Sequence, residues 1–336
     1  MPKRKVTLIE GDGIGPEIIA SVKKIFAAAE VPIEWEEENA GERVFETKGE
    51  FIPQSLIESI KRNKIALKGP ITTPVGHGFQ SINVQLRQMF DLYQNLRPCK
   101  TTVGVRSRFE NVDLVIFREN TEGLYAGLSF YDKRLGISDS IARVSKHGCY
   151  RIVKAAFEYA RKNNRKKVTS VHKANIIKEG GRIFLEAGQE VSLQYPDIAW
   201  DDKIIDNMSM QLVLKPEMFD VIVTTNLFGD ILSDLCAGLV GGLGVVAGAN
   251  IGDEVAIFEA VHGSAPDIAG KDLANPTAVL RSAFLMLNYM DLNEYSERIE
   301  KALNLTLIDT VSCTGDLGGK GTTSSFTEKI IRNLEK

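Results

Sequence analysis

Residues 221–234 constrain the fold most, because a short β-branched run passes directly into a segment with helical spacing. The first half, VIVTT, is typical of a buried strand. The second half, NLFGDILSD, carries Asp230 and Asp234, which share one helix face because positions four apart lie one turn apart. This strand-to-helix unit predicts an open α/β sheet, in which ligands bind beyond the carboxyl ends of the strands.

The carboxylates of Asp230 and Asp234 allow two interpretations. Like charges at that spacing repel, so a plain structural helix gains nothing from the pair. A hard divalent cation such as Mg²⁺ or Mn²⁺ favours carboxylate oxygens and would turn the repulsion into binding. From these residues alone, a solvated acidic face and a metal site remain equally open.

Composition narrows the class of protein. The chain has 336 residues, enough for about two domains with a large core, and its net charge of −3 attracts neither nucleic acid nor anionic membrane. No run of about 20 apolar residues predicts a membrane span. Cys99, Cys149, Cys236 and Cys313 are scattered without a C-x-x-C pair, which indicates a reducing compartment. We therefore expect a cytoplasmic enzyme.

Two glycine-rich segments come close to the dinucleotide-binding fingerprint G-x-G-x-x-G and fail its requirements. In GDGIGPE (11–17), between a predicted strand and a predicted helix, Pro16 takes the place of the third glycine. GLGVVA (242–247) follows a helical segment rather than a strand. The predicted α/β fold is therefore not a Rossmann fold.

Three arginines, Arg87, Arg97 and Arg118, lie at the ends of predicted elements. Arg87 belongs to a helical segment that begins near Ser81 and Asn83. Free N–H groups at a helix start, together with hydroxyl, amide and guanidinium side chains, are well suited to hold a carboxylate. Each arginine alone could be an ordinary surface partner, but the set favours a substrate with several carboxylates or phosphates.

Two further charged residues follow or begin predicted elements. Lys173 follows the strand predicted at 168–172 and is either a proton-transfer group or an exposed lysine. Asp206 lies at the start of a helical stretch, where an acid also stabilises the helix dipole. The residue types and positions of Lys173 and Asp206 alone do not decide between a catalytic or metal-binding role and a structural one.

Eight motifs occur in order along the chain. They are GDGIGPE (11–17), KGPITTP (68–74), SINVQLR (81–87), LYQNLRP (92–98), FRENTEGLYAG (117–127), VHKANI (171–176), NLFGDILSD (226–234) and HGSAPDIAGKDLANP (262–276). With these motifs the chain resembles the β-decarboxylating dehydrogenases, a family of isocitrate, homoisocitrate, 3-isopropylmalate and tartrate/D-malate dehydrogenases. The resemblance covers essentially the whole chain.

The resemblance implies an isocitrate/isopropylmalate dehydrogenase-like two-domain α/β fold. Residues 1–92 and 241–336 would form the large, cofactor-side domain, and residues 93–240 the small domain. A dimerisation arm is implied at about 124–143. The implied assembly is a homodimer with shared active sites, and a higher oligomer stays open.

The resemblance also implies roles for single residues. Tyr125 and Lys173 would transfer protons. A tricarboxylate substrate would be bound by Ser81, Asn83, Arg87, Arg97 and Arg118. Mg²⁺ or Mn²⁺ would be held by Asp206, Asp230 and Asp234, with Lys173 and Asp206 contributed by the neighbouring chain. NAD would be bound by Thr72, Thr73, Asn175, His262, Gly263, Ser264, Ala265, Asp267, Ile268 and Asn275.

Within the family, substrate and cofactor choice depend on a few positions. Polar Ser81 and Asn83 facing an isopropyl group would each leave a donor unpaired, at a cost of roughly 1–3 kcal/mol. Isocitrate is therefore favoured over 3-isopropylmalate, while homoisocitrate keeps the third carboxylate and stays an alternative. Asp267, followed by Ile268, would accept from ribose hydroxyls and repel a 2′-phosphate, which favours NAD, although Lys271 is close by in sequence.

Two other functions compete with this interpretation. A metal-dependent phosphohydrolase could use the same acids and arginines, but it leaves the 262–276 motif unexplained. A non-catalytic regulatory subunit would be expected to lack Tyr125, Lys173 or one of the three aspartates, and all are present.

Overall fold

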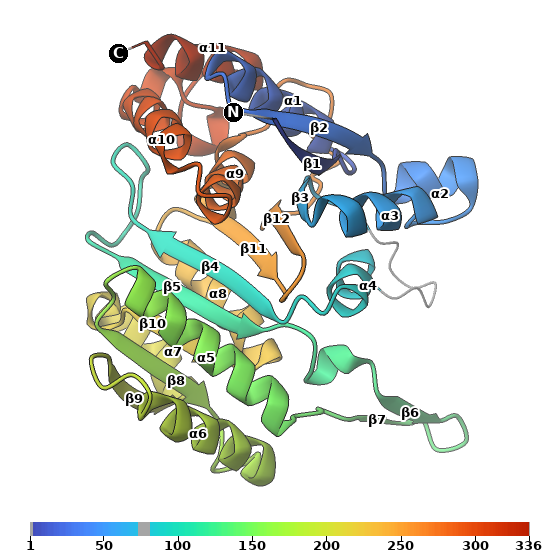
Figure 1. Ribbon diagram of the computed structural model, residues 1–336, viewed down its shortest axis with the longest axis vertical. Coiled ribbons are helices and arrows are strands. Elements are labelled where there is room, and N and C mark those ends of the chain that lie inside the picture. The colour runs from blue at the N-terminus through green and yellow to red at the C-terminus, as the bar shows by residue number, and fades with distance from the viewer. Residues whose placement is uncertain (1–2, 73–80, 336) are drawn as a thin grey trace.

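The computed structural model describes residues 3–72 and 81–335, and within them a ten-stranded mixed sheet runs through the whole molecule (Figure 1). In the order in which they lie side by side, its strands are β2 (Ile33–Glu38), β1 (Arg4–Ile9), β3 (Ile65–Lys68), β12 (Ala256–Ala260), β11 (Ala247–Ile251), β4 (Gln94–Lys100), β5 (Asp113–Glu119), β10 (Val221–Thr224), β8 (Lys167–His172) and β9 (Ala199–Ile204).

The sheet consists of two parallel groups joined by an antiparallel centre. Strands β2, β1, β3 and β12 are parallel, and so are β5, β10, β8 and β9. Between the groups, β11 and β4 are antiparallel to each other and to their outer neighbours. This strand order and the antiparallel centre differ from the order 3-2-1-4-5-6 of a Rossmann sheet, so the prediction of an α/β fold that is not a Rossmann fold is confirmed.

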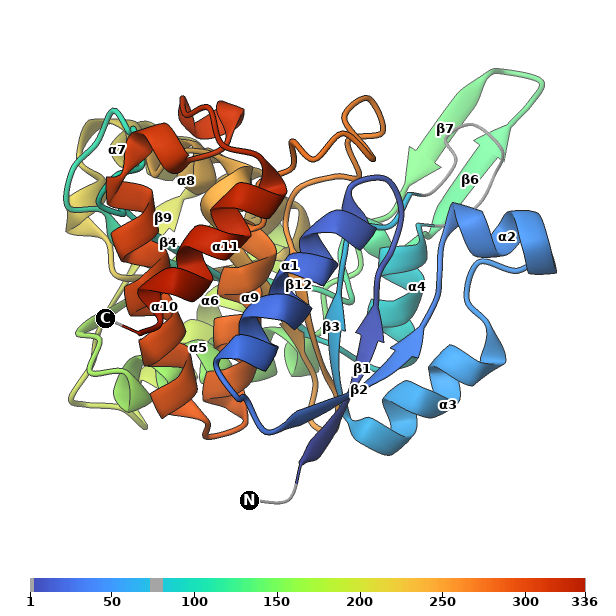
Figure 2. The same cartoon turned by 90° about the horizontal axis from the view of Figure 1, so that it is seen from above.

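Helices cover both faces of the sheet (Figure 2). They are α1 (Gly15–Ala28), α2 (Glu42–Lys48), α3 (Gln54–Asn63), α4 (Ile82–Met89), α5 (Lys146–Lys162), α6 (Lys178–Ser192), α7 (Ile205–Leu214), α8 (Asn226–Leu239), α9 (Thr277–Tyr289), α10 (Asn293–Ile308) and α11 (Thr323–Asn333). Helices α1, α5, α6, α9, α10 and α11 share one continuous core, whereas α3 with α4, and α7 with α8, form two separate smaller cores.

The alternation of side chains along the strands places the large core on one face of the sheet and the two smaller cores on the other. Leu8 on β1 and Val115 on β5 belong to the large core, whereas their neighbours Ile9 and Leu114 belong to the two smaller ones. Successive strand residues point to opposite faces, so both small cores lie on the second face. The interval between them, beside β4 and β11, holds several buried charged side chains.

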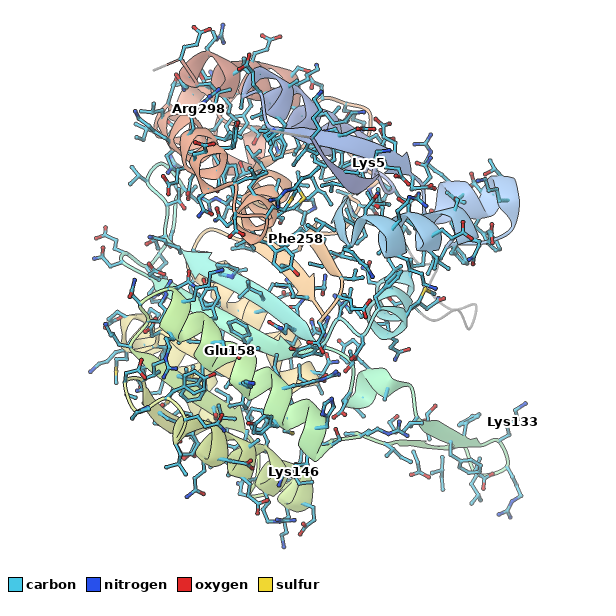
Figure 3. The ribbon with its side chains drawn as sticks, viewed as in Figure 1. Lys5, Lys133, Lys146, Glu158, Phe258 and Arg298 are labelled. Carbon is cyan, nitrogen blue, oxygen red and sulfur yellow. The ribbon has the colours of Figure 1, made fainter. Side chains whose placement is uncertain are left out.

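A two-stranded hairpin, β6 (Ser129–Asp132) and β7 (Ile137–Ser140), projects from the lower half of the molecule (Figure 1). Lys133 lies at its far end, and Lys146 lies at its base where α5 begins (Figure 3). Phe130 and Ile137 expose their apolar side chains on it. The predicted domain division and dimerisation arm stay predictions.

No helix within the described ranges is both long and apolar enough to cross a membrane.

A buried polar network crosses the centre of the sheet. Glu259 on β12 forms an ion pair with Lys68 Nζ at 2.6 Å and accepts a hydrogen bond from Asn250 Nδ2 at 2.7 Å. Asn95 and Asn120 in turn donate to Asn250 Oδ1 at 2.8 and 2.9 Å. Burial alone would raise the pKa of Glu259, but Lys68 and a neighbouring guanidinium hold it far below its usual range. Glu259 is therefore a buried anion.

We predict that Glu259→Gln strongly destabilises the protein, because it removes the charge that balances buried Lys68. Breaking a buried pair from one side costs about 3–5 kcal/mol of unfolding free energy. The matched control is Glu254→Gln, whose partner Lys64 at 2.9 Å is exposed, with an expected loss of about 0–1 kcal/mol. Denaturant unfolding of both variants checks this, and equal losses would contradict it.

Candidate active site

Three buried arginines converge in the interval between the two small cores. Asn95 on β4 lies opposite Arg118 on β5, so Arg97, two residues along, points to the same face. Arg118 is 1% exposed; its Nε and Nη2 donate to Asn226 Oδ1 at 2.9 and 2.8 Å, and its Nη1 pairs with Asp230. Asn226 is not among the predicted site residues, although its place at the start of α8, just after strand β10, was an available signal.

These guanidinium groups raise the local positive potential. Burial lowers the pKa of Arg97 to about 10, with Arg87 and Arg118 adding repulsion that Glu259 partly offsets. Burial, and then repulsion from Arg87, likewise lower the pKa of Arg118. Groups that repel one another in this way are stabilised by a ligand with several negative charges.

The start of α4 offers polar atoms with unmet hydrogen-bonding capacity. Ser81 stands at the N-cap, yet its hydroxyl makes no capping hydrogen bond. Asn83 Oδ1 and Arg87 Nε are buried, with no hydrogen-bond partner in the described part of the chain. Because buried polar atoms are rarely left unpaired, these atoms fit a polar ligand. The structure thus brings Ser81, Asn83 and Arg87 together on one helix.

The phenol of Tyr125 is in contact with the carboxylate of Asp230. The Tyr125 hydroxyl donates to Asp230 Oδ2 at 2.5 Å, and Arg118 lies 5.0 Å from the centre of the Tyr125 ring. Burial, followed by the bond to Asp230, raises the pKa of Tyr125, so the phenol stays protonated at neutral pH. Burial also acts to raise the pKa of Asp230, but Arg118 and Tyr125 outweigh it and keep the group ionised.

Asp234 lies one turn further along α8. It is exposed, and no hydrogen bond or ion pair engages its carboxylate among residues 3–72 and 81–335. Partial desolvation raises its pKa, opposed by Arg97 and reinforced by Asp230. Carboxylate oxygens are the donors that Mg²⁺ and Mn²⁺ prefer, so Asp230 and Asp234 fit a metal in donor type. The described residues contain no group of three acids, histidines or cysteines arranged for a metal.

Lys173 and Asp206 form a separate pair. Lys173 follows β8, Asp206 stands in the first turn of α7, and Lys173 Nζ donates to Asp206 Oδ1. This bond lowers the pKa of Asp206, whose side chain is 69% exposed. Across the described ranges, no hydrogen bond or ion pair joins Lys173 or Asp206 to Asp230 or Asp234. The predicted catalytic and metal residues thus fall into two clusters within a single chain.

Part of the predicted cofactor site is assembled around the turn after β12. The hydroxyls of Thr72 and Ser264 lie 2.7 Å apart. His262 Nδ1 contacts the Gly263 carbonyl at 3.0 Å and must donate to it, which makes Nε2 an acceptor. Burial lowers the pKa of His262, and Nε2 is buried without a partner in the described residues, so it fits a ligand hydroxyl or amine. Thr73 lies outside the described residues.

The other predicted cofactor residues differ in how fully they are engaged. Asn275 uses both amide atoms, donating to Asp316 Oδ2 and accepting from Thr277 N, each at 2.9 Å. Lys271 Nζ donates to the backbone carbonyl of Asp267 at 2.7 Å rather than to its carboxylate. Lys271 therefore leaves the Asp267 carboxylate available.

The last three predicted cofactor residues are divided between two places. Ala265 and Ile268 pack against the large core. Asn175 is exposed in the turn after β8, and in the described part of the chain no hydrogen bond joins it to the 262–276 segment.

The glycine-rich segment at 11–17 supports the turn after β12, a role that was not predicted for it. Asp12 is buried and accepts from Thr72 N at 2.8 Å. Gly13 has a φ of +57°, and Ile14 N donates to the Ser264 carbonyl at 2.8 Å. The motif therefore holds Thr72 through the Asp12 carboxylate and Ser264 through a backbone hydrogen bond. An acid flanked by two glycines was the available signal.

Comparisons with known proteins agree on one family. A sequence model described as "Isocitrate/isopropylmalate dehydrogenase" matches residues 5–330. The probable alpha chain of the mitochondrial NAD isocitrate dehydrogenase of Drosophila melanogaster is 49% identical over 332 residues, 98% of this chain and 88% of the relative. A mitochondrial NAD isocitrate dehydrogenase chain of Dictyostelium discoideum, named as a regulatory subunit, is 49% identical, covering 98% and 92%. The crystal structure of isocitrate dehydrogenase from Methylococcus capsulatus superposes with a TM-score of 0.96 at 48% identity, covering 99% and 100%.

The expectation of a cytoplasmic location is wrong, because these curated relatives are named as mitochondrial proteins. All four cysteines are free and buried. Thiol usage reports only the redox state of the surroundings, and a reducing compartment need not be the cytosol.

We predict that Gly13→Ala destabilises the protein and loosens the turn at Ser264. A Cβ at Gly13 would lie 2.0 Å from the Ser264 carbonyl oxygen, and the φ of +57° disfavours any L side chain. The matched control is Gly238→Ala in α8, where a Cβ meets no atom within 4 Å and helix propensity gains up to about 1 kcal/mol. Thermal unfolding should show a loss for Gly13→Ala only, and equal midpoints would refute the proposed packing.

Proposed function

The chain belongs to the isocitrate/isopropylmalate dehydrogenase family, and we infer that it oxidises and decarboxylates isocitrate to 2-oxoglutarate and CO₂ with reduction of NAD⁺. One observation carries this conclusion: buried Arg97 and Arg118 gather beside a helix where the Ser81 hydroxyl makes no capping hydrogen bond and Asn83 Oδ1 has no partner among the described residues. A tricarboxylate supplies the several negative charges and the polar third arm that such a pocket needs.

Substrate binding follows from the three arginines and α4. Arg87, Arg97 and Arg118 hold the two carboxylates of the malate-like half by charge-assisted hydrogen bonds. Ser81 and Asn83 bind the third carboxylate, which 3-isopropylmalate lacks. The relatives' names support isocitrate, and the alternative of homoisocitrate is not favoured.

The proton transfers use the two clusters in turn. Lys173 takes part in removing the proton from the substrate hydroxyl. When bound, NAD would accept the hydride, and a divalent cation held by Asp206, Asp230 and Asp234 would stabilise negative charge on the substrate oxygen. Tyr125, whose raised pKa keeps it protonated, then delivers a proton to the carbon that has lost CO₂. Asp230 orients the phenol for this step through its 2.5 Å contact.

NAD is bound on the large-domain side, in this proposal. Thr72, Ser264 and His262 Nε2 face the cofactor with hydroxyl and imidazole groups. The Asp267 carboxylate, which Lys271 does not engage, accepts from the adenosine ribose and repels a 2′-phosphate. The relatives' names, which specify NAD, support the same choice.

The catalytic unit is, in this proposal, a dimer in which each site takes Lys173 and Asp206 from the neighbouring chain. The separation of these two residues from Asp230 and Asp234 supports it, because one chain offers an incomplete metal site across its described ranges. Domains of 1–92 with 241–336 and of 93–240, and an arm at 124–143, belong to the same proposal. The relatives are named as subunits, which supports an assembly of several chains, mixed or identical.

The two competing functions are less well supported. A phosphohydrolase needs no nicotinamide, whereas the relatives' names specify NAD. The Dictyostelium relative is named as regulatory, but this chain keeps Tyr125, Lys173 and all three aspartates. We therefore propose a catalytic chain.

We predict NADH formation from isocitrate with Mg²⁺ or Mn²⁺ in a panel that also contains homoisocitrate, 3-isopropylmalate and D-malate, each with NAD⁺ and NADP⁺. Ser81→Leu should lower kcat/KM for isocitrate by about 10- to 100-fold and raise the relative activity on 3-isopropylmalate, because a polar partner of the third carboxylate is lost. The control is Thr322→Leu, which alters the N-cap of α11 instead. Absence of turnover with isocitrate and NAD⁺ would sink the proposed function.

We predict that inactive Asp206→Asn and Asp230→Asn proteins regain activity when their chains are exchanged. Each hybrid dimer then contains one intact shared site, so random pairing restores about a quarter of wild-type activity. The control mixture of Asp230→Asn and Asp234→Asn stays inactive, because both residues belong to the same side of a site. No recovery despite proven exchange of chains would count against shared sites.

A further inference from the structure

His172, the last residue of β8, makes two contacts with two different segments. Its side chain is buried, and it directly precedes Lys173. Ala174 N donates to its Nδ1 at 3.1 Å, and its Nε2 lies 2.9 Å from Asp202 Oδ2 on β9. A neutral ring with the proton on Nε2 satisfies both contacts, accepting through Nδ1 and donating through Nε2.

The Nδ1 contact belongs to the turn that carries Lys173. The Lys173 carbonyl accepts from Ile176 N at 3.0 Å and Ile177 N at 2.8 Å. On the other side, Gly181 of α6 packs so closely that an added Cβ would lie 2.5 Å from Ala174 Cα. The His172 ring closes this turn from the strand side, so the backbone at Lys173 is held from three directions.

The Nε2 contact reaches the segment that carries Asp206. Asp202 lies on β9, where His172 and Ile204 are register partners. Strand β9 passes directly into α7, and Asp206 stands in the first turn of that helix. The ring therefore links the segment before Lys173 to the segment before Asp206, and those two side chains form an ion pair with each other.

We propose that His172 is a positioning residue that acts through both neighbours: Nδ1 sets the turn at Lys173, and Nε2 sets the place of Asp206. This inference rests on the proposed function for the roles of Lys173 and Asp206. In this proposal His172 acts through these two segments, without contacting substrate or cofactor. Its two ring nitrogens have separable effects, one on proton transfer and one on metal affinity.

Two substitutions separate the contacts, because each reproduces one ring nitrogen. In His172→Asn the amide oxygen takes the place of Nδ1 and can still accept from Ala174 N. In His172→Gln the amide nitrogen takes the place of Nε2 and can still donate to Asp202. His147, exposed on α5, provides the matched controls His147→Asn and His147→Gln.

Three measurements on the full-length protein read the two effects. Steady-state kinetics at saturating Mn²⁺ gives kcat, and Mn²⁺ alone, titrated and followed by electron paramagnetic resonance, gives metal affinity without turnover. Amide hydrogen exchange of the peptide that contains Ala174 reports the turn directly. We expect His172→Gln to lower kcat by about 10- to 100-fold, well beyond His172→Asn, and to speed exchange at Ala174. We expect His172→Asn to weaken Mn²⁺ binding by about tenfold, and His172→Gln to leave it within about twofold.

The split between the two variants is the decisive result. A general loss of stability would affect both alike, so equal losses in kcat, Mn²⁺ affinity and exchange would overturn the inference, as would two variants that match wild type. If the wild-type protein itself fails to turn over isocitrate, the proposed function falls. The Mn²⁺ and exchange measurements then still decide whether His172 positions both segments.

Discussion

Burial of positive charge at the centre of the sheet is the constraint on which the rest of the structure depends. Lys68, Arg87, Arg97 and Arg118 are all largely withdrawn from water, and isolated buried cations are strongly unfavourable. Glu259 balances part of this charge from β12. Buried asparagines satisfy the remaining donors and acceptors, as Asn226 does at Arg118. The balance stays positive towards the second face, and in the proposed function an anionic substrate completes it.

The antiparallel centre of the sheet explains why these charges can gather there. The large core covers one face continuously, but on the other face the two small cores are separate. Strands β4 and β11 lie between the parallel groups, and Phe258 on β12 lies close to that boundary (Figure 3). Helix α4 enters the interval from one side and α8 from the other. Polar side chains can therefore meet there without disturbing either apolar core.

Features that depend on neighbouring residues could be predicted from the sequence, whereas contacts between residues far apart in the chain could not. The β-branched run of β10 and the spacing of Asp230 and Asp234 predicted a strand, a helix and a shared face, because all three depend on nearby residues. Glu259 and Asp12 escaped notice, since each matters through groups distant in the chain: Lys68 lies 191 positions before Glu259, and Asp12 accepts from Thr72 N. Neither the strand order nor the antiparallel centre follows from periodicity. The predicted cytoplasmic location was wrong for another reason: free thiols report the redox state of the surroundings rather than the location of the protein.

The two charged clusters differ in how firmly each is held, and that difference suits a shared site. Arg118 is almost fully buried and pairs with Asp230, so replacing this contact requires another charge in the same low-dielectric place. The Lys173–Asp206 pair is exposed on the Asp206 side, where ion pairs contribute only about 0–1 kcal/mol. In the proposed dimer, Lys173 and Asp206 can therefore change partners at little cost. In the same proposal the arginine cluster keeps the geometry that binds substrate, and His172 positions the segments that carry Lys173 and Asp206.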